Sequence, residues 1–349
     1  MDAVITQRYW SQRAPAELGR RLQLIQGAQW LSAIGDDPYA RVLRGFDDDP
    51  YPLYERLGRA GPMVSNRAGV WVTASRALAT EIMVHPGFGP MTAGSPYAPY
   101  NVVPLDEDIV HAVPHSAASL VEPVTRVVDS LTGEVDLVGG FATRICAEVL
   151  AETFDVPLHW LVERIASTGV AVDAALCPQS LAATRRMLSA LDDLRDRLGD
   201  PGAVLLTVVG AQVATTLLGN TLDMVLDEPS RASRVVDETL SLRPPVHLHA
   251  LIARSDLDFG GARVTAGDQV VVLVGAVNRD GAGAPLLLGP PYAAVFPFAR
   301  VVTETALSVL TERFPSLRRT GPVLRRRRAP VTRVLLRLPA SIDVRDEAR

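Results

Sequence analysis

The sequence predicts a mainly α-helical fold with a minor β component, on the basis of three observations. Apolar residues recur at helical spacing through most of the chain, and the longest such stretch runs from about Ala203 to Leu226. Alternating, strand-like segments are confined to regions near the two ends of the chain. No pattern repeats with a period of 20–50 residues, which excludes a solenoid.

The N-terminal half is expected to contain helices at 16–30, 51–61 and 76–85, because each pattern is amphipathic and the last two stop at Gly or Pro. A strand, a turn and a second strand are expected at 63–75. The stretch 87–114 is rich in Gly, Pro, Ser and Tyr and is predicted to be a loop. Acidic residues in "GDDPYARVLRGFDDDP" are interpreted as a solvated turn with helix-capping aspartates.

The C-terminal half continues the helical pattern. The expected elements, in order, are helices over 116–154 with a break at 132–137, helices over 158–198, the apolar helix already named, a short helix at 238–242, a strand–turn–strand unit at 256–280, a helix at 301–315 and an edge strand at 325–339. No clean linker separates them, so we expect one structural domain overall.

Composition excludes several classes of function. The net charge is −4, which gives no general attraction to nucleic acid or acidic membranes. All 35 basic residues are arginine, which we attribute to a GC-rich bacterial genome. The run Arg325–Arg328 is short and isolated, so we interpret it as a solvated guard on an edge strand, with contact to an acidic partner face as the alternative.

The two cysteines, Cys146 and Cys177, cannot build a disulfide framework or a CxxC metal site. Cys146 lies in an apolar helical pattern, which predicts a buried structural thiol. The first residues lack the apolar core of a signal peptide, and the longest apolar stretches are broken by Gly, Gln and Thr. We therefore expect no membrane span and a cytoplasmic location.

Six segments, in the same order along the chain, resemble bacterial haem-thiolate monooxygenases, the cytochromes P-450. This resemblance covers roughly residues 50–338 and implies a cytochrome P-450-like fold. The segments are "DPYPLYERLGRAGPM", "GVWVTASRALATEIMVHPGF", "GEVDLVGGFATRICAEVLAETFDVP", "ETLSLRPPVHLH", "DLDFGGARVTAGDQVVVLVGAVNRD" and "ALSVLTERFPSL".

The haem-ligand loop of that family is degenerate here. In the monooxygenases a cysteine thiolate holds the iron from a Gly-rich loop just before the helix that "VVTETALSVLTERFP" resembles. The corresponding stretch, "GAGAPLLLGPPYAAVFPFA" at 281–299, contains no Cys, His, Met or charged residue and is shortened. An axial ligand cannot come from this loop.

Other positions that the resemblance marks as functional have also changed. The acid and threonine that deliver protons to bound oxygen align with Gln212 and Val213. The family's buried Glu–Arg pair aligns with Glu238 and Ser241, and Arg243 is too far around the helix to replace the lost cation.

Cations that the family uses to pair the haem propionates are missing as well. No arginine occurs from 77 to 125, where one or two are expected. A further position aligns with Leu251, although Arg254 is close enough to leave the register open. Two carboxylates without such partners are costly to bury.

The chain resembles most closely a haem-less branch of this superfamily. These are auxiliary proteins of the glycosyltransferases that attach deoxysugars, often aminosugars, to macrolide and anthracycline antibiotics in actinomycetes. Residues 1–49 resemble the branch-specific N-terminal arm, and 50–349 form the P-450-like part. The resemblance implies an activator and stabiliser of a cognate transferase, with no catalytic residue, cofactor or metal, acting in a hetero-oligomer that is a heterotetramer.

Two hypotheses concern groups of residues. An emptied haem site would forfeit packing on every wall, so we expect apolar side chains to fill it; these are Leu286, Leu287, Leu288, Phe296 and Phe298. An apolar stripe on the N-terminal arm is expected either to dock the partner or to pack on its own domain; its members are Leu18, Leu22, Ile25 and Trp30.

Two alternatives remain open. His247 and His249 in "HLH" could ligate haem in a P-450 fold of another kind, in which case the protein would show a Soret band. A monooxygenase-derived enzyme with altered chemistry is the other alternative, although no Ser/His/Asp set or carboxylate pair stands out. The sequence does not identify the sugar, the aglycone or the transferase.

Overall fold

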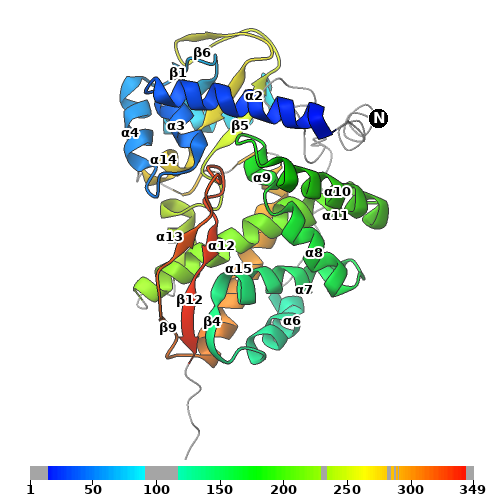
Figure 1. Cartoon of the computed structure of the whole chain (residues 1–349). Helices are drawn as coiled ribbons and strands as arrows, with labels where there is room; N and C mark the ends of the chain where they lie inside the picture. Colours follow the sequence, from blue (N-terminus) through cyan, green and yellow to red (C-terminus); the bar gives the residue numbers. More distant parts are fainter. Residues whose placement is uncertain are drawn as a thin grey trace, which may run out of the picture.

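The computed structural model describes residues 15–90, 117–228, 234–280 and 284–342, apart from 287 and 290. Helices make up most of this part of the chain, and its strands form four small sheets. Figure 1 shows the helices stacked around a long central pair, with most strands near one end of the molecule. The prediction of a mainly α-helical fold with a minor β component is confirmed.

The N-terminal helices lie on the outside of the molecule, above the largest sheet (Figure 1). They are α2 (Pro15–Ile34), α3 (Pro38–Arg44) and α4 (Tyr51–Ala60). Asp37 caps α3, as the acidic cluster predicted, because its carboxylate accepts a hydrogen bond from the Ala40 amide at 3.0 Å. Leu18 and Leu22 of α2 belong to the same buried core as the rest of the protein.

The largest sheet contains strands from the N-terminal part of the chain and strands from its C-terminal part. Its strand order is β1 (Val64–Ser65), β2 (Trp71–Thr73), β8 (Gln269–Val272), β5 (His249–Ala253) and β3 (Phe88–Pro90). The parallel pairing of β2 with β8 connects segments almost 200 residues apart, and helix α5 (Arg76–Val84) follows β2. The expected strands at 63–75 are therefore confirmed, whereas most of the expected loop at 87–114 lies outside the described residues.

Helices separated by short breaks form the middle of the chain. In order, the elements are α6 (Ala117–Asp129), β4 (Gly133–Asp136), a π-helical segment (Leu137–Ala142), α7 (Thr143–Thr153), α8 (Leu158–Thr168), α9 (Ala171–Ala174) and α10 (Leu181–Leu198).

A continuous helical stretch crosses the centre of the molecule. It comprises α11 (Pro201–Leu205), a π-helical segment (Leu206–Gly210) and α12 (Ala211–Asp227), and it packs on α15 (Tyr292–Arg313). By length and composition both stretches could cross a membrane, which corrects the expectation that the apolar runs fall short. The first is almost entirely buried in the protein and the second is half buried, as core helices of soluble proteins also are.

The C-terminal region departs from the expectation in three places. The second strand of the 256–280 unit ends at Val272, and α14 (Val274–Arg279) follows. Helix α15 begins at Tyr292 rather than near Val301; Pro291 is its N-cap residue and Pro297 lies inside the helix.

The expected edge strand is divided into three short strands. They are β10 (Leu324–Arg325), β11 (Leu335–Arg337) and β12 (Pro339–Ile342), and β12 lies between β4 and β9 (Arg318–Arg319). The remaining elements are α13 (Val235–Leu242) and the hairpin of β6 (Leu257–Phe259) with β7 (Ala262–Val264), which turns through Gly260 and Gly261 at positive φ.

Candidate functional site

The start of α12, near the middle of the continuous helical stretch from Pro201 to Asp227, is where the resemblance places proton delivery to bound oxygen. Val213 is completely buried and carries no exchangeable proton. Gln212 is buried and faces α9, where its Oε1 accepts from the Val172 amide at 3.3 Å and its Nε2 donates to Asp173 at 3.4 Å. Gln212 therefore joins two helices by hydrogen bonds and presents no acid to a ligand.

Asp173 is a buried carboxylate that the sequence did not single out. It accepts hydrogen bonds from the amides of Val331 and Thr332 at 2.8 and 2.9 Å, and from the Thr332 hydroxyl at 2.6 Å. Burial raises the pKa of Asp173, and these donors oppose that shift. The carboxylate ties α9 and, through Gln212, α12 to the C-terminal segment.

Helices α12 and α15 meet directly beside the expected ligand loop. A Cβ at Gly210 would lie 3.5 Å from the Phe298 ring, and Phe298 is buried. Leu288 is buried too, whereas Leu286 and Phe296 are partly buried against the same core. Leu287 lies outside the described residues. Four of the five side chains are thus buried or partly buried, and whether they fill a former haem site stays a prediction.

The thiols do not fit the chemistry of a haem-thiolate ligand. Cys146 accepts a hydrogen bond from Thr215 between α7 and α12, and Cys177 follows α9. Burial raises the pKa of Cys146 to about 11 and that of Cys177 to about 12, so both are protonated thiols at neutral pH. With no donor in the 281–299 stretch, the residues present do not fit a cysteine-ligated haem.

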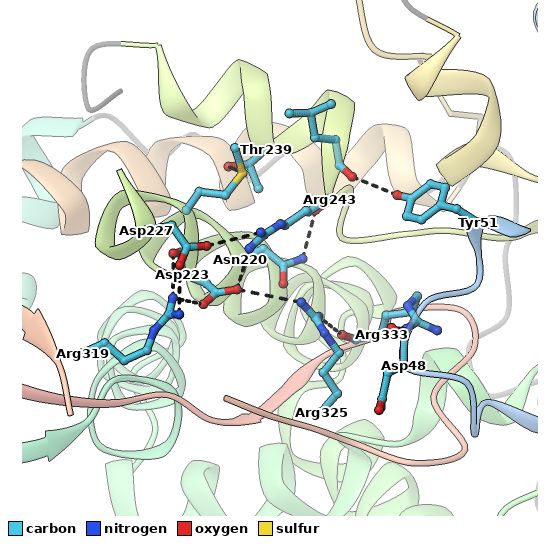
Figure 2. A network of polar contacts seen from close by, with 12 residues as sticks. Asp48, Tyr51, Asn220, Asp223, Asp227, Thr239, Arg243, Arg319, Arg325 and Arg333 are labelled. Atoms are coloured by element: carbon cyan, nitrogen blue, oxygen red, sulfur yellow. Dashed lines mark hydrogen bonds and ion pairs between the residues drawn. The ribbon is translucent and has the colours of Figure 1, made fainter. Parts of the chain in front are cut away.

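The expected Glu–Arg pair is replaced by a different ion network, shown in Figure 2. The Ser241 hydroxyl donates to the Asp237 carbonyl within its own helix at 3.0 Å. Arg243, at the end of α13, instead pairs with Asp223 at 2.5 Å and with Asp227 at 3.4 Å, both on α12.

Two further arginines converge on the same carboxylates (Figure 2). Arg319 of β9 pairs with Asp223 at 2.5 Å and with Asp227 at 2.9 Å, and Arg325 of β10 lies 3.9 Å from Asp223. Because the Asp223 side chain is only 7% exposed, this network joins α12, α13 and the C-terminal strands in a shielded place.

The arginine run at 325–328 was therefore only partly understood from the sequence. Arg325 is partly buried in the network, and Arg326 donates to the Gly169 carbonyl. Among the four arginines of this run, Arg327 is exposed and the other three are partly buried. The interpretation as a solvated edge-strand guard is therefore corrected in part: among the described strands β10 pairs with β11 alone, but three of the four arginines are partly buried against other elements.

Leu251 lies in β5 and is buried, opposite Pro90 and Val270 in the neighbouring strands. Arg254 stands one residue past the strand and is exposed. In the register that uses Leu251, the position that the resemblance assigns to a propionate partner is apolar and buried; in the register that uses Arg254, it is an exposed arginine just past the strand, and the register stays open.

The two histidines are both buried but contact different elements. His247 packs beside Tyr51 and Tyr54 of α4, with its Nδ1 3.4 Å from the Tyr54 hydroxyl. His249 packs edge-on to Tyr292 at the start of α15, with ring centroids 5.2 Å apart. Burial lowers the pKa of both, that of His249 to about 4. Among the described residues, no group of three or more His, Cys, Asp or Glu could hold a metal ion.

The proposed docking stripe on α2 is corrected in part. Leu18 and Leu22 are buried in the core of this chain and cannot meet a partner. Ile25 is partly buried, whereas Trp30 is 39% exposed with the Arg44 guanidinium 3.9 Å above its ring. Of the two alternatives expected for this stripe, packing on the protein's own domain holds for Leu18 and Leu22.

The polar clusters that sequence reasoning missed had weak signals. Asp223 and Asp227 stand one turn apart at the end of an otherwise apolar helix, a spacing that puts both on one face. Their partners Arg243 and Arg319 come from distant segments, and only the fold brings them together.

Comparisons with known proteins agree with this architecture. No family model matches the sequence. AknT of Streptomyces galilaeus is 32% identical, with 94% of this chain and 96% of that protein covered. DesVIII of Streptomyces venezuelae is 36% identical, with 94% of each covered, and TylM3 of Streptomyces fradiae is 33% identical, with 93% and 92% covered.

Solved structures of cytochromes P450 are similar to the chain. CYP164A2 of Mycobacterium smegmatis superposes with a TM-score of 0.70 at 21% identity, covering 87% of this chain and 99% of that one. This likeness shows the fold. Taken with the relatives that match along nearly their whole length, it shows that the chain belongs to the family of P450-like auxiliary proteins of antibiotic glycosyltransferases represented by AknT, DesVIII and TylM3.

Proposed function

We propose that this protein is a non-catalytic partner that activates and stabilises one glycosyltransferase. The transferase would move a TDP-deoxysugar to a macrolide or anthracycline-type aglycone. One observation supports the absence of catalysis: the first turn of α12 offers Gln212 and Val213 where a monooxygenase needs a proton relay, and Gln212 is hydrogen-bonded to α9. The apolar, ligand-free stretch before α15 supports the same conclusion.

Activation without chemistry requires differential affinity. The protein must bind the competent state of the transferase more tightly than the other states, since a partner shifts an equilibrium only by that difference. Binding the folded but not the unfolded transferase also stabilises it by mass action. The action is therefore stoichiometric. We further propose a heterotetramer with two copies of each chain, in the cytoplasm, with no cofactor and no metal.

The test is to produce the cognate glycosyltransferase with and without this chain and to compare sugar transfer and thermal stability. The expected result is higher activity and a higher melting temperature of the co-produced transferase, with haem and reductants omitted. Equal activity and equal stability in the two preparations would overturn the proposal. Any glycosyltransferase encoded beside this chain in its genome is the first enzyme to use.

A histidine-ligated haem protein is the second candidate, and one observation favours it. The Nε2 atom of His249 is buried and makes no hydrogen bond in the described structure, so it retains a free lone pair or proton. Hemin added to the purified protein distinguishes the two functions. A Soret band that disappears in His249→Phe would support the haem protein, and a spectrum of free hemin would support the auxiliary partner.

A further inference from the structure

The second half of α2 carries an exposed apolar face without any charge. From Leu22 to Gly35 the sequence contains no Asp, Glu, Lys or Arg. Leu24, Leu31 and Ile34 are 67, 73 and 71% exposed. Their spacing, with Gly27 between them, places all of them on one side of the helix, opposite the buried Leu18 and Leu22. In Figure 1, α2 lies on the outside of the molecule.

A cavity of about 210 Å³ adjoins this face. Ala28, Ser32 and Gln29 of α2 form one wall, and the rim includes Ala28 and Ala68, both exposed. The inner wall includes Tyr39, which is 1% exposed and whose hydroxyl makes no hydrogen bond in the described structure. An unsatisfied buried hydroxyl is destabilising, and an incoming polar group can supply the missing hydrogen bond.

Size decides which occupant fits. A strip from Leu24 to Ile34 is about 16 Å long at 1.5 Å per residue. It offers a few hundred Å², which is typical of a functional patch on a monomer. A stable specific interface buries about 800 Å² per partner, so pairing of α2 with α2 of a second copy is too small. A larger partner that covers α2 and its surroundings meets the requirement.

We propose that the outer face of α2 and the adjoining cavity dock the glycosyltransferase. An uncharged apolar segment of that enzyme covers Leu24, Leu31 and Ile34. One large side chain with a polar tip enters the cavity and bonds the Tyr39 hydroxyl, in the manner of interface anchors that fill desolvated pockets. The inference rests on the proposed function and adds the surface through which it acts.

The test compares exposed substitutions at two places. Leu24→Arg and Leu31→Arg put a charge on the proposed face, whereas Val84→Arg puts one at an 80% exposed apolar position on α5. All three variants are expected to keep the melting temperature of the parent protein. Affinity for the transferase, measured by calorimetry, is expected to fall at least tenfold for the two leucine variants and to stay unchanged for Val84→Arg.

A second variant probes the cavity. Tyr39→Phe removes the buried unpaired hydroxyl, so the free protein is expected to be as stable as the parent or more stable, while its affinity for the transferase falls at least threefold. Undiminished binding of Tyr39→Phe would overturn the role of the cavity, since a merely structural tyrosine predicts that result.

The outcomes separate the surface from the function. If the leucine variants bind and activate the transferase as the parent does, the proposed surface is wrong and the function stands. If the parent protein itself neither binds nor activates, the proposed function fails. If Leu31→Arg turns a dimer of this chain into a monomer on size-exclusion chromatography without changing transferase binding, a second copy covers α2 and the proposal is overturned.

Discussion

Individual residues at the former catalytic positions have acquired structural roles of their own. Gln212 bonds α9 to α12, and Ser241 donates back into its own helix. Thr216 donates to the Gln212 carbonyl one turn earlier, and Thr215 donates to Cys146. Such local bonds satisfy buried polar groups, so substitution here is expected to act on stability rather than on any chemistry.

His249 is expected to make the protein sensitive to acid. Burial lowers its pKa from 6.5 to about 4, so the unfolded chain takes up the proton first as the pH falls. The stability from the neutral imidazole is complete above pH 6.5 and is lost as the pH falls toward 4. At pH 5 the loss is about 2 kcal/mol.

Replacing His249 by Phe keeps an aromatic ring against Tyr292 and removes the titrating group. Urea unfolding at pH 7 and pH 5 is expected to show that the parent loses about 2 kcal/mol more than His249→Phe. His159→Gln, at an exposed position, serves as the control and should lose as much as the parent. Equal losses in the parent and in His249→Phe would contradict this assignment.

At the scale of elements, the ion network around Asp223 holds α12, α13 and the C-terminal strands together (Figure 2). In the cytochromes P-450 that the chain resembles, a Glu–Arg pair supports the haem-ligand loop. Here the arginine at the end of α13 turns toward α12 instead. The network therefore stabilises the junction of α12, α13 and the C-terminal strands, and it does not contact the stretch before α15 through these ion pairs.

Asp223→Ala is expected to lower the free energy of unfolding by about 2–3 kcal/mol, because it removes the shielded carboxylate and leaves the more exposed Asp227 as the remaining partner of Arg243 and Arg319. Asp227→Ala is the matched control; its carboxylate is 44% exposed, and we expect a cost of about 1 kcal/mol or less. Guanidinium unfolding measures both. Equal, small losses would mean that the network contributes little beyond surface pairing.

Phe298→Ala is expected to lower the unfolding free energy by about 3–5 kcal/mol, because it opens a cavity between α12 and α15. Phe46→Ala, at a ring that is 39% exposed, is the comparison and should cost clearly less. A loss below about 1 kcal/mol for Phe298→Ala would show that this region is not filled by packing, against the account given for the emptied site.

The elements were predictable to different degrees. Periodicity found α4, α5 and the long α12 stretch because their apolar faces are uninterrupted. It missed α14, which continues an apolar run, and it started α15 late because Pro297 resembles a stop. The sequence alone could not distinguish the inward face of α2 from its outward face. Leu18 and Leu24 are the same residue type, and only the packing of other elements makes the first buried and the second exposed.

For the molecule as a whole, the resemblance was more informative than any single motif. Six weak segments in the expected order predicted a fold that the relatives and solved structures confirm. The absence of an axial haem ligand could be inferred from the sequence, because that ligand is one cysteine in one loop and the loop at 281–299 contains no cysteine. The ion network and the buried Asp173 could not, because each depends on contacts between segments far apart in the chain.

The most direct measurement is a titration of the purified cognate glycosyltransferase with the haem-free protein, in which the rate of sugar transfer is followed without added haem or reductant. The account predicts that the rate rises and saturates near one equivalent of this chain per transferase subunit. A rate that stays at the level of the transferase alone, or that rises only when haem and an electron donor are supplied, would contradict it.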